Sequence, residues 1–113
     1  MQLQLGEAGD GFLNVALTGR LDTPGVVRIE AELTAYLVRR GTRATIDLSQ
    51  VAFISSAGIR MFITIARALD RNGGRMALYG ARPAVAQVLQ TVSLNNIVPV
   101  RADASAAEGV VRG

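Results

Sequence analysis

The sequence has 113 residues, a formal net charge of +3, and neither cysteine nor histidine. Without these two residue types the chain has no disulfide, thiolate nucleophile or Ser-His-Asp site, and it lacks the commonest metal ligand. All 12 cations are arginines interspersed with acidic residues, so the pI of about 10.6 indicates a solvated surface and not a nucleic-acid-binding patch.

No apolar run is long enough to span a bilayer, and the first residues lack the pattern of a secretory signal. We therefore expect a single domain over residues 1–113, located in the cytoplasm and without direct membrane insertion.

The first half of the chain predicts a hairpin followed by a helix. Alternating apolar residues predict strands at residues 3–5 and 13–18, joined by a glycine-rich turn over residues 7–11. Thr23 is predicted to cap the next helix, with Pro24 in the first helical position. That helix is predicted to end near residues 39–41. Its inward stripe comprises Val26, Ile29, Leu33, Tyr36 and Leu37.

A buried strand is predicted next, and it leads through two serines into an amphipathic helix. The predicted inward positions of the strand are Ala44, Ile46, Leu48, Val51 and Phe53. The predicted helical stripe is Ile59, Phe62, Ile63, Ala66 and Leu69. Residues 72–74 end that helix by their asparagine and glycine content.

The remaining segments predict a strand, a helix, a short strand and a terminal helix. The strand contains Met76 and Leu78, and the short strand lies at residues 97–100. The helix opened by Pro83 carries Val85, Val88, Leu89 and Val92 inward, and the terminal helix over residues 104–111 carries Ala107, Val110 and Val111. This order predicts an α/β fold with an N-terminal hairpin, mainly parallel core strands and helices packed on the sheet.

Ser55 and Ser56 are the candidate functional residues, because they stand at the predicted helix N-terminus. Serine is a favoured cap for the unpaired N–H groups there. The same position favours a phosphate group, since the helix dipole is positive at this end. The residues alone leave both interpretations open.

The segment from Asp47 to Phe53, followed by Ser55-Ser56-Ala57-Gly58-Ile59, resembles the core motif of the STAS domain family. That family is named after sulfate transporters and anti-sigma factor antagonists. Residues 19–22 are similar to its Gly-x-Leu-Asp turn, and residues 75–94 to its last core strand and helix. Two positions differ: Ser55 replaces the usual aspartate, and Ser93 replaces a common glycine.

The resemblance implies an anti-sigma factor antagonist with Ser56 as its phosphorylated residue. Such a protein binds an anti-sigma factor that carries a serine-kinase domain and so frees a sigma factor, and a serine phosphatase is a further candidate partner. The expected contact residues are Asp22, Thr23, Ser55, Ala57, Gly58, Ile59 and Arg60. The alternative is a non-catalytic STAS subunit of a bacterial lipid-transport ABC complex.

Enzymatic chemistry finds little support in the sequence. Asp22 and Asp47 are the only carboxylates near strand ends that could share a site, and each is also a natural turn or cap residue. The glycines lack the order of a phosphate-binding loop. We therefore expect a non-enzymatic protein without cofactor or metal. Gly58 either lets a partner's backbone approach or eases a tight turn, and a bulky residue there is expected to abolish binding with the fold intact.

Overall fold

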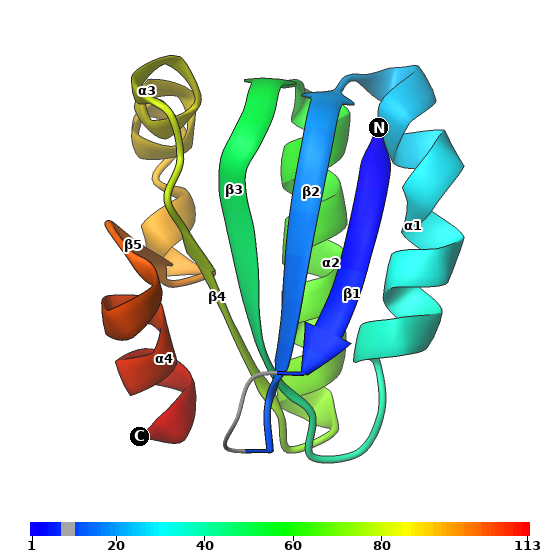
Figure 1. Cartoon of the computed structure of the whole chain (residues 1–113), viewed down its shortest axis with the longest axis vertical. Helices are drawn as coiled ribbons and strands as arrows, with labels where there is room; N and C mark the ends of the chain where they lie inside the picture. The colour runs from blue at the N-terminus through cyan, green and yellow to red at the C-terminus, as the bar shows by residue number, and fades with distance from the viewer. Residues whose placement is uncertain (8–10) are drawn as a thin grey trace.

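The computed structural model describes residues 1–7 and 11–113, and these form a five-stranded sheet flanked by helices (Figure 1). The strands are β1 (Gln2–Glu7), β2 (Leu13–Leu21), β3 (Arg43–Ile54), β4 (Arg75–Tyr79) and β5 (Val100–Arg101). The helices are α1 (Thr23–Leu37), α2 (Ser56–Arg71), α3 (Pro83–Thr91), α4 (Ala104–Arg112) and the 3-10 turn Leu94–Asn96.

The sheet has the order β1-β2-β3-β4-β5, with β1 antiparallel to β2 and every later pair parallel. This arrangement confirms the predicted mixed sheet with an N-terminal hairpin. The predicted hairpin turn at residues 7–11 includes residues 8–10, which lie outside the described part of the chain. Parallel strands place their carboxyl ends at one edge, so the ends of β2 and β3 lie next to each other where α1 and α2 begin.

The core lies mainly between the sheet and the helices α1 and α2. Because side chains alternate between the two faces of a strand, Met76 and Leu78 join this core, whereas Ala77 faces α4. Helix α1 buries Val26, Ile29, Leu33 and Leu37 as predicted. Tyr36 is half-buried, and its hydroxyl donates a hydrogen bond to the Gly6 carbonyl at 3.1 Å.

The predicted inward position of Phe53 is wrong. Its side chain is 39% exposed, and Ile54 takes the buried place at 3%. The register between β2 and β3 shifts twice, between Ala16 and Thr18 and again between Gly19 and Arg20. A register shift of this kind ends the simple alternation of inward and outward side chains, so the end of β3 points Phe53 away from the core.

The predicted stripe of α2 is displaced by part of a turn. Its buried residues are Gly58, Met61, Phe62, Ile65 and Leu69. Ile59, Ile63 and Ala66 flank them and are half-buried.

The end of the chain also differs from the prediction. Helix α3 ends at Thr91, so Val92 is 47% exposed. Ser93 follows with φ of 55°, the left-handed conformation that glycine adopts most easily. Ile97 is 44% exposed, because the last strand contains only Val100 and Arg101.

Candidate functional site

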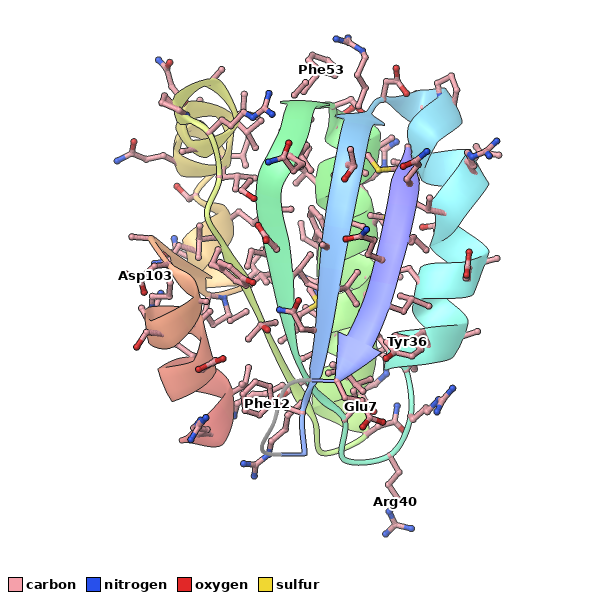
Figure 2. The ribbon with its side chains drawn as sticks, in the orientation of Figure 1. Glu7, Phe12, Tyr36, Arg40, Phe53 and Asp103 are labelled. Carbon is pink, nitrogen blue, oxygen red and sulfur yellow. The ribbon has the colours of Figure 1, made fainter. Side chains whose placement is uncertain are left out.

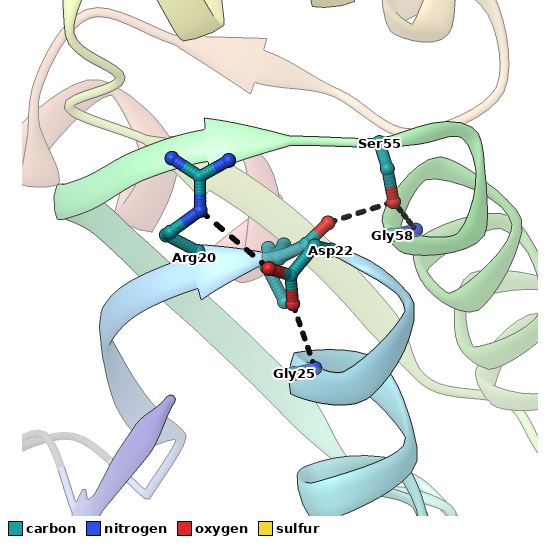
Figure 3. A network of polar contacts seen from close by, with 6 residues as sticks. Arg20, Asp22, Gly25, Ser55 and Gly58 are labelled. Atoms are coloured by element: carbon teal, nitrogen blue, oxygen red, sulfur yellow. Dashed lines mark hydrogen bonds and ion pairs between the residues drawn. The ribbon is translucent and has the colours of Figure 1, made fainter.

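Ser55 is the N-cap of α2, and its side chain is fully engaged (Figure 3). The hydroxyl donates to the Leu21 carbonyl at 2.8 Å and accepts a longer bond of 3.5 Å from the Gly58 N–H. The Ser55 N–H donates to the same Leu21 carbonyl at 2.9 Å. Ser55 therefore connects the start of α2 to the end of β2 through hydrogen bonds.

Ser56 is the first residue of α2 and is exposed. Its hydroxyl has no hydrogen-bond partner within residues 1–7 and 11–113. The N–H groups of Ser56 and Ala57 belong to the first turn, where the helix itself offers no acceptor. The two adjacent serines therefore differ in role, since Ser55 is part of the fold and Ser56 presents a free hydroxyl beside free N–H groups.

Asp22 caps the neighbouring helix, α1. One carboxylate oxygen accepts from the Gly25 N–H at 2.9 Å, and the other lies 3.5 Å from the Arg20 Nε (Figure 3). The predicted capping role of Thr23 is therefore wrong, because Thr23 is already the first helical residue. Gly25 explains the geometry: a Cβ at this position would lie 2.1 Å from the Arg20 carbonyl oxygen, so the first turn approaches β2 closely.

Gly58 is buried, and the close approach that it permits is internal. A Cβ here would lie 2.9 Å from Ile54 Cγ1 and 3.2 Å from the Leu21 carbonyl oxygen. Of the two roles left open by the sequence, the tight strand-to-helix turn is the one that the structure supports. A bulky residue at Gly58 would perturb the packing, so the expectation of an intact fold in such a variant is wrong.

The other expected contact residues divide between surface and core. Thr23, Ala57 and Arg60 line a groove between α1 and α2, together with Val27 and Glu30. Ile59 is half-buried and packs against the core. Arg60 makes no hydrogen bond or ion pair with the part of the chain that the structure describes.

Three further residues at this edge were not identified from the sequence. The Arg20 guanidinium lies over the exposed Phe53 ring, 4.4 Å from its centroid. Val27, which lines the groove between α1 and α2, is 75% exposed. The place of Arg20 inside the Gly-x-Leu-Asp turn was a signal for it in the sequence, whereas the outward direction of Phe53 follows from strand pairing.

Asp47 does not join Asp22 in a shared acidic site. Its carboxylate accepts from the Ser49 N–H at 2.8 Å, a local contact within β3 where the register with β2 shifts. On the same part of the sheet, Asn14 donates to the Tyr79 hydroxyl at 3.1 Å. Burial and the nearby Asp47 carboxylate raise the pKa of Tyr79 above 10.0, against the lowering effect of Asn14.

Within the described residues, no group of three or more acidic or other metal-binding side chains is placed to hold a metal ion. None of the helices in those residues is long and apolar enough to cross a membrane.

Comparison with known proteins identifies the family. The family model described as "Mlab, STAS domain" matches residues 7–99, so the chain belongs to the STAS domain family. The protein named "Putative anti-sigma factor antagonist BtrV" from Bordetella bronchiseptica is 32% identical over 98 residues, or 87% of this chain and 84% of BtrV.

Solved structures confirm the fold. An anti-sigma factor antagonist from Mycobacterium paratuberculosis superposes with a TM-score of 0.86 at 24% identity, over 99% of this chain and 94% of that one. The unphosphorylated form of the antagonist SpoIIAA superposes with a TM-score of 0.78 at 24% identity, over 99% of this chain and 97% of SpoIIAA. The phosphorylated form of SpoIIAA from Bacillus superposes with a TM-score of 0.69 at 21% identity, over 96% of this chain and 99% of that one.

Proposed function

We propose that this chain is an anti-sigma factor antagonist controlled by phosphorylation of Ser56. In the unmodified state it binds an anti-sigma factor that carries a serine-kinase domain, and a sigma factor is released. The observation that carries the proposal is the exposed, unengaged Ser56 hydroxyl on the first turn of α2. The relationship to BtrV supports the choice of partner.

The local structure suits a phosphate group on Ser56. The kinase would transfer the γ-phosphoryl group of ATP to Ser56 Oγ, with loss of the hydroxyl proton and release of ADP. The new dianion would face the free N–H groups of Ser56 and Ala57 and the positive end of the helix dipole. Arg60 follows one turn later and has no competing ion pair among the described residues.

The proposed contact surface is built around this serine. Thr23, Ala57 and Arg60 contribute the walls of the groove between α1 and α2. Asp22 and Ser55 hold the two helix starts in place, and Gly58 and Ile59 pack the first turn of α2 against the core. A serine phosphatase is the proposed partner that restores the unmodified state.

Intact-mass analysis with the kinase-type anti-sigma factors of the source genome and ATP tests the modification. The wild-type chain should gain one phosphate, and Ser56→Ala should gain none. Ser55→Ala is the matched control, because it removes the adjacent hydroxyl and should still be modified. Modification of Ser56→Ala to the wild-type extent would refute the assignment. Retention of the phosphate in Ser56→Ala together with its loss from Ser55→Ala would move the acceptor to Ser55.

A further inference from the structure

An aromatic side chain stands at the edge of the proposed contact surface without a place in the core. Phe53 is 39% exposed, two residues before Ser55, at the end of the sheet where α1 and α2 begin (Figure 2). The register shift between Gly19 and Arg20 pairs Phe53 with Arg20 across β2 and β3. Strand pairing therefore holds the ring outward, and no flexible loop is involved.

The orientation of Phe53 is reinforced by Arg20. The guanidinium lies 4.4 Å from the ring centroid, and its Nε lies 3.5 Å from the Asp22 carboxylate. That carboxylate is fixed in turn by the Gly25 N–H at the start of α1. The ring and the guanidinium are thus ordered before any partner binds, which lowers the entropic cost of association.

Two arginines at this edge are open to an acidic partner, although Glu30 also lines the groove beside Arg60. Asp22 is already occupied by Arg20 and by the α1 N-terminus, so it offers little to a partner. The side chain of Arg20 is 60% exposed, and Arg60 has no ion pair with the described residues. Arg20 and Arg60 therefore both have N–H groups that can donate hydrogen bonds to a carboxylate of the partner.

We propose that Phe53 and Arg20 form the main anchor of the partner-binding surface. The inference rests on the proposed function and specifies its partner: the anti-sigma factor presents an apolar recess for the Phe53 ring, bordered by carboxylates that bind Arg20 and Arg60. Aromatic and arginine side chains dominate the energetics of protein interfaces. Phe53 lies three residues before Ser56, at the end of the sheet where α1 and α2 begin.

The anchor also explains why phosphorylation of Ser56 should weaken partner binding. A phosphate on Ser56 brings roughly two negative charges close to Arg60, in a groove that Glu30 also lines. The dianion neutralises Arg60 and repels the carboxylates that border the recess. Phosphorylation therefore removes the electrostatic attraction, although neither Phe53 nor Arg20 is itself modified.

Calorimetric titration against each purified kinase-type anti-sigma factor of the source genome tests the anchor. Phe53→Ala should weaken binding by about 30-fold or more, as expected for an interface hot spot. Arg20→Gln should weaken it by about tenfold and reduce its dependence on salt concentration. Leu5→Ala is the matched control, since Leu5 is 38% exposed on β1 near the opposite end of the sheet.

The outcomes separate the anchor from the proposed function. If the wild-type chain binds a partner and Phe53→Ala binds as tightly as Leu5→Ala, the anchor is wrong and the function stands. If the wild-type chain binds none of the anti-sigma factors, the proposed function fails and the anchor fails with it. Thermal melts of each variant check that the folded protein is being compared.

Discussion

Two helical glycines provide an internal test of the packing at the start of α2. Both Gly58 and Gly109 lie in helices and neither has a positive φ, so alanine suits the backbone at both. A Cβ at Gly109 would meet nothing within 4 Å, whereas one at Gly58 would meet Ile54 Cγ1 at 2.9 Å and Leu21 Cβ at 3.1 Å. The same substitution should therefore have opposite effects on stability.

The expected magnitudes follow from this difference. Gly109→Ala should stabilise the fold by about 0.5–1 kcal/mol, the usual preference for alanine over glycine in a helix. At Gly58 the same gain is opposed by an overpacking cost of about 1–3 kcal/mol, because Leu21 and Ile54 cannot both move away. Ser55 holds the Leu21 carbonyl in place through two hydrogen bonds. Gly58→Ala should therefore lose about 1 kcal/mol.

Urea unfolding and thermal melts followed by circular dichroism measure both variants against the wild type. The melting temperature should fall by about 4 °C for Gly58→Ala and rise by a similar or smaller amount for Gly109→Ala. A Gly58→Ala variant as stable as Gly109→Ala would refute the close approach of α2 to β2. It would also restore Gly58 as a usable position for testing the partner surface.

Further predictions concern the cap and the half-buried Tyr79. Ser55→Ala removes the α2 cap and should cost about 1 kcal/mol in urea unfolding, and an unchanged midpoint would contradict its fastening role. The pKa of Tyr79 is raised above 10.0, so the folded chain keeps this proton longer than the unfolded chain. The resulting stability is complete below about pH 10 and is lost as pH rises through the folded pKa. Tyrosinate absorbance should show a late-titrating component that Tyr79→Phe removes; a component that persists in this variant would contradict the assignment.

The sequence predicted the order of elements and the position of the serines. Long apolar periodicities identify α1, α2 and the parallel strands, because each element must bury one face against the sheet. The start of α2 was clear from two serines between a buried strand and an apolar helix. The STAS family model matches residues 7–99, which include this segment with its strand ending and the tight turn at Gly58.

The errors arise where tertiary contacts choose between local options of similar energy. Asp22 and Thr23 are both good caps, and the close approach of Gly25 to the Arg20 carbonyl selects Asp22. Helix α2 has apolar residues on a broad face, so its periodicity alone did not select Met61 over Ile59 as a core residue. The outward direction of Phe53 depends on register shifts between β2 and β3, and such shifts cannot be predicted from the apolar pattern of one strand.

Ser56 has the structural features of a residue that switches binding without switching the fold. Its side chain contributes no hydrogen bond to the described structure, and the α2 dipole favours an anion at this end. Ser56→Asp and Ser56→Ala should therefore melt within about 2 °C of the wild type, the range of ordinary surface substitutions. Any loss of partner affinity in the Asp variant then belongs to the interface.

The size of that loss can be bounded from the charges. A phosphate brings about −1.5 to −2 charges to a surface that must lose water on binding, and a penalty of roughly 3–4 kcal/mol corresponds to a few hundredfold in affinity. Aspartate carries a single charge on a shorter side chain, so Ser56→Asp should lose about tenfold to a hundredfold, while Ser56→Ala binds normally. Titration of the phosphorylated protein and both variants against one anti-sigma factor measures the series. Equal affinities for all three would refute the electrostatic switch and favour a constitutive subunit of a lipid-transport complex, in which Ser56 is only the first residue of a helix.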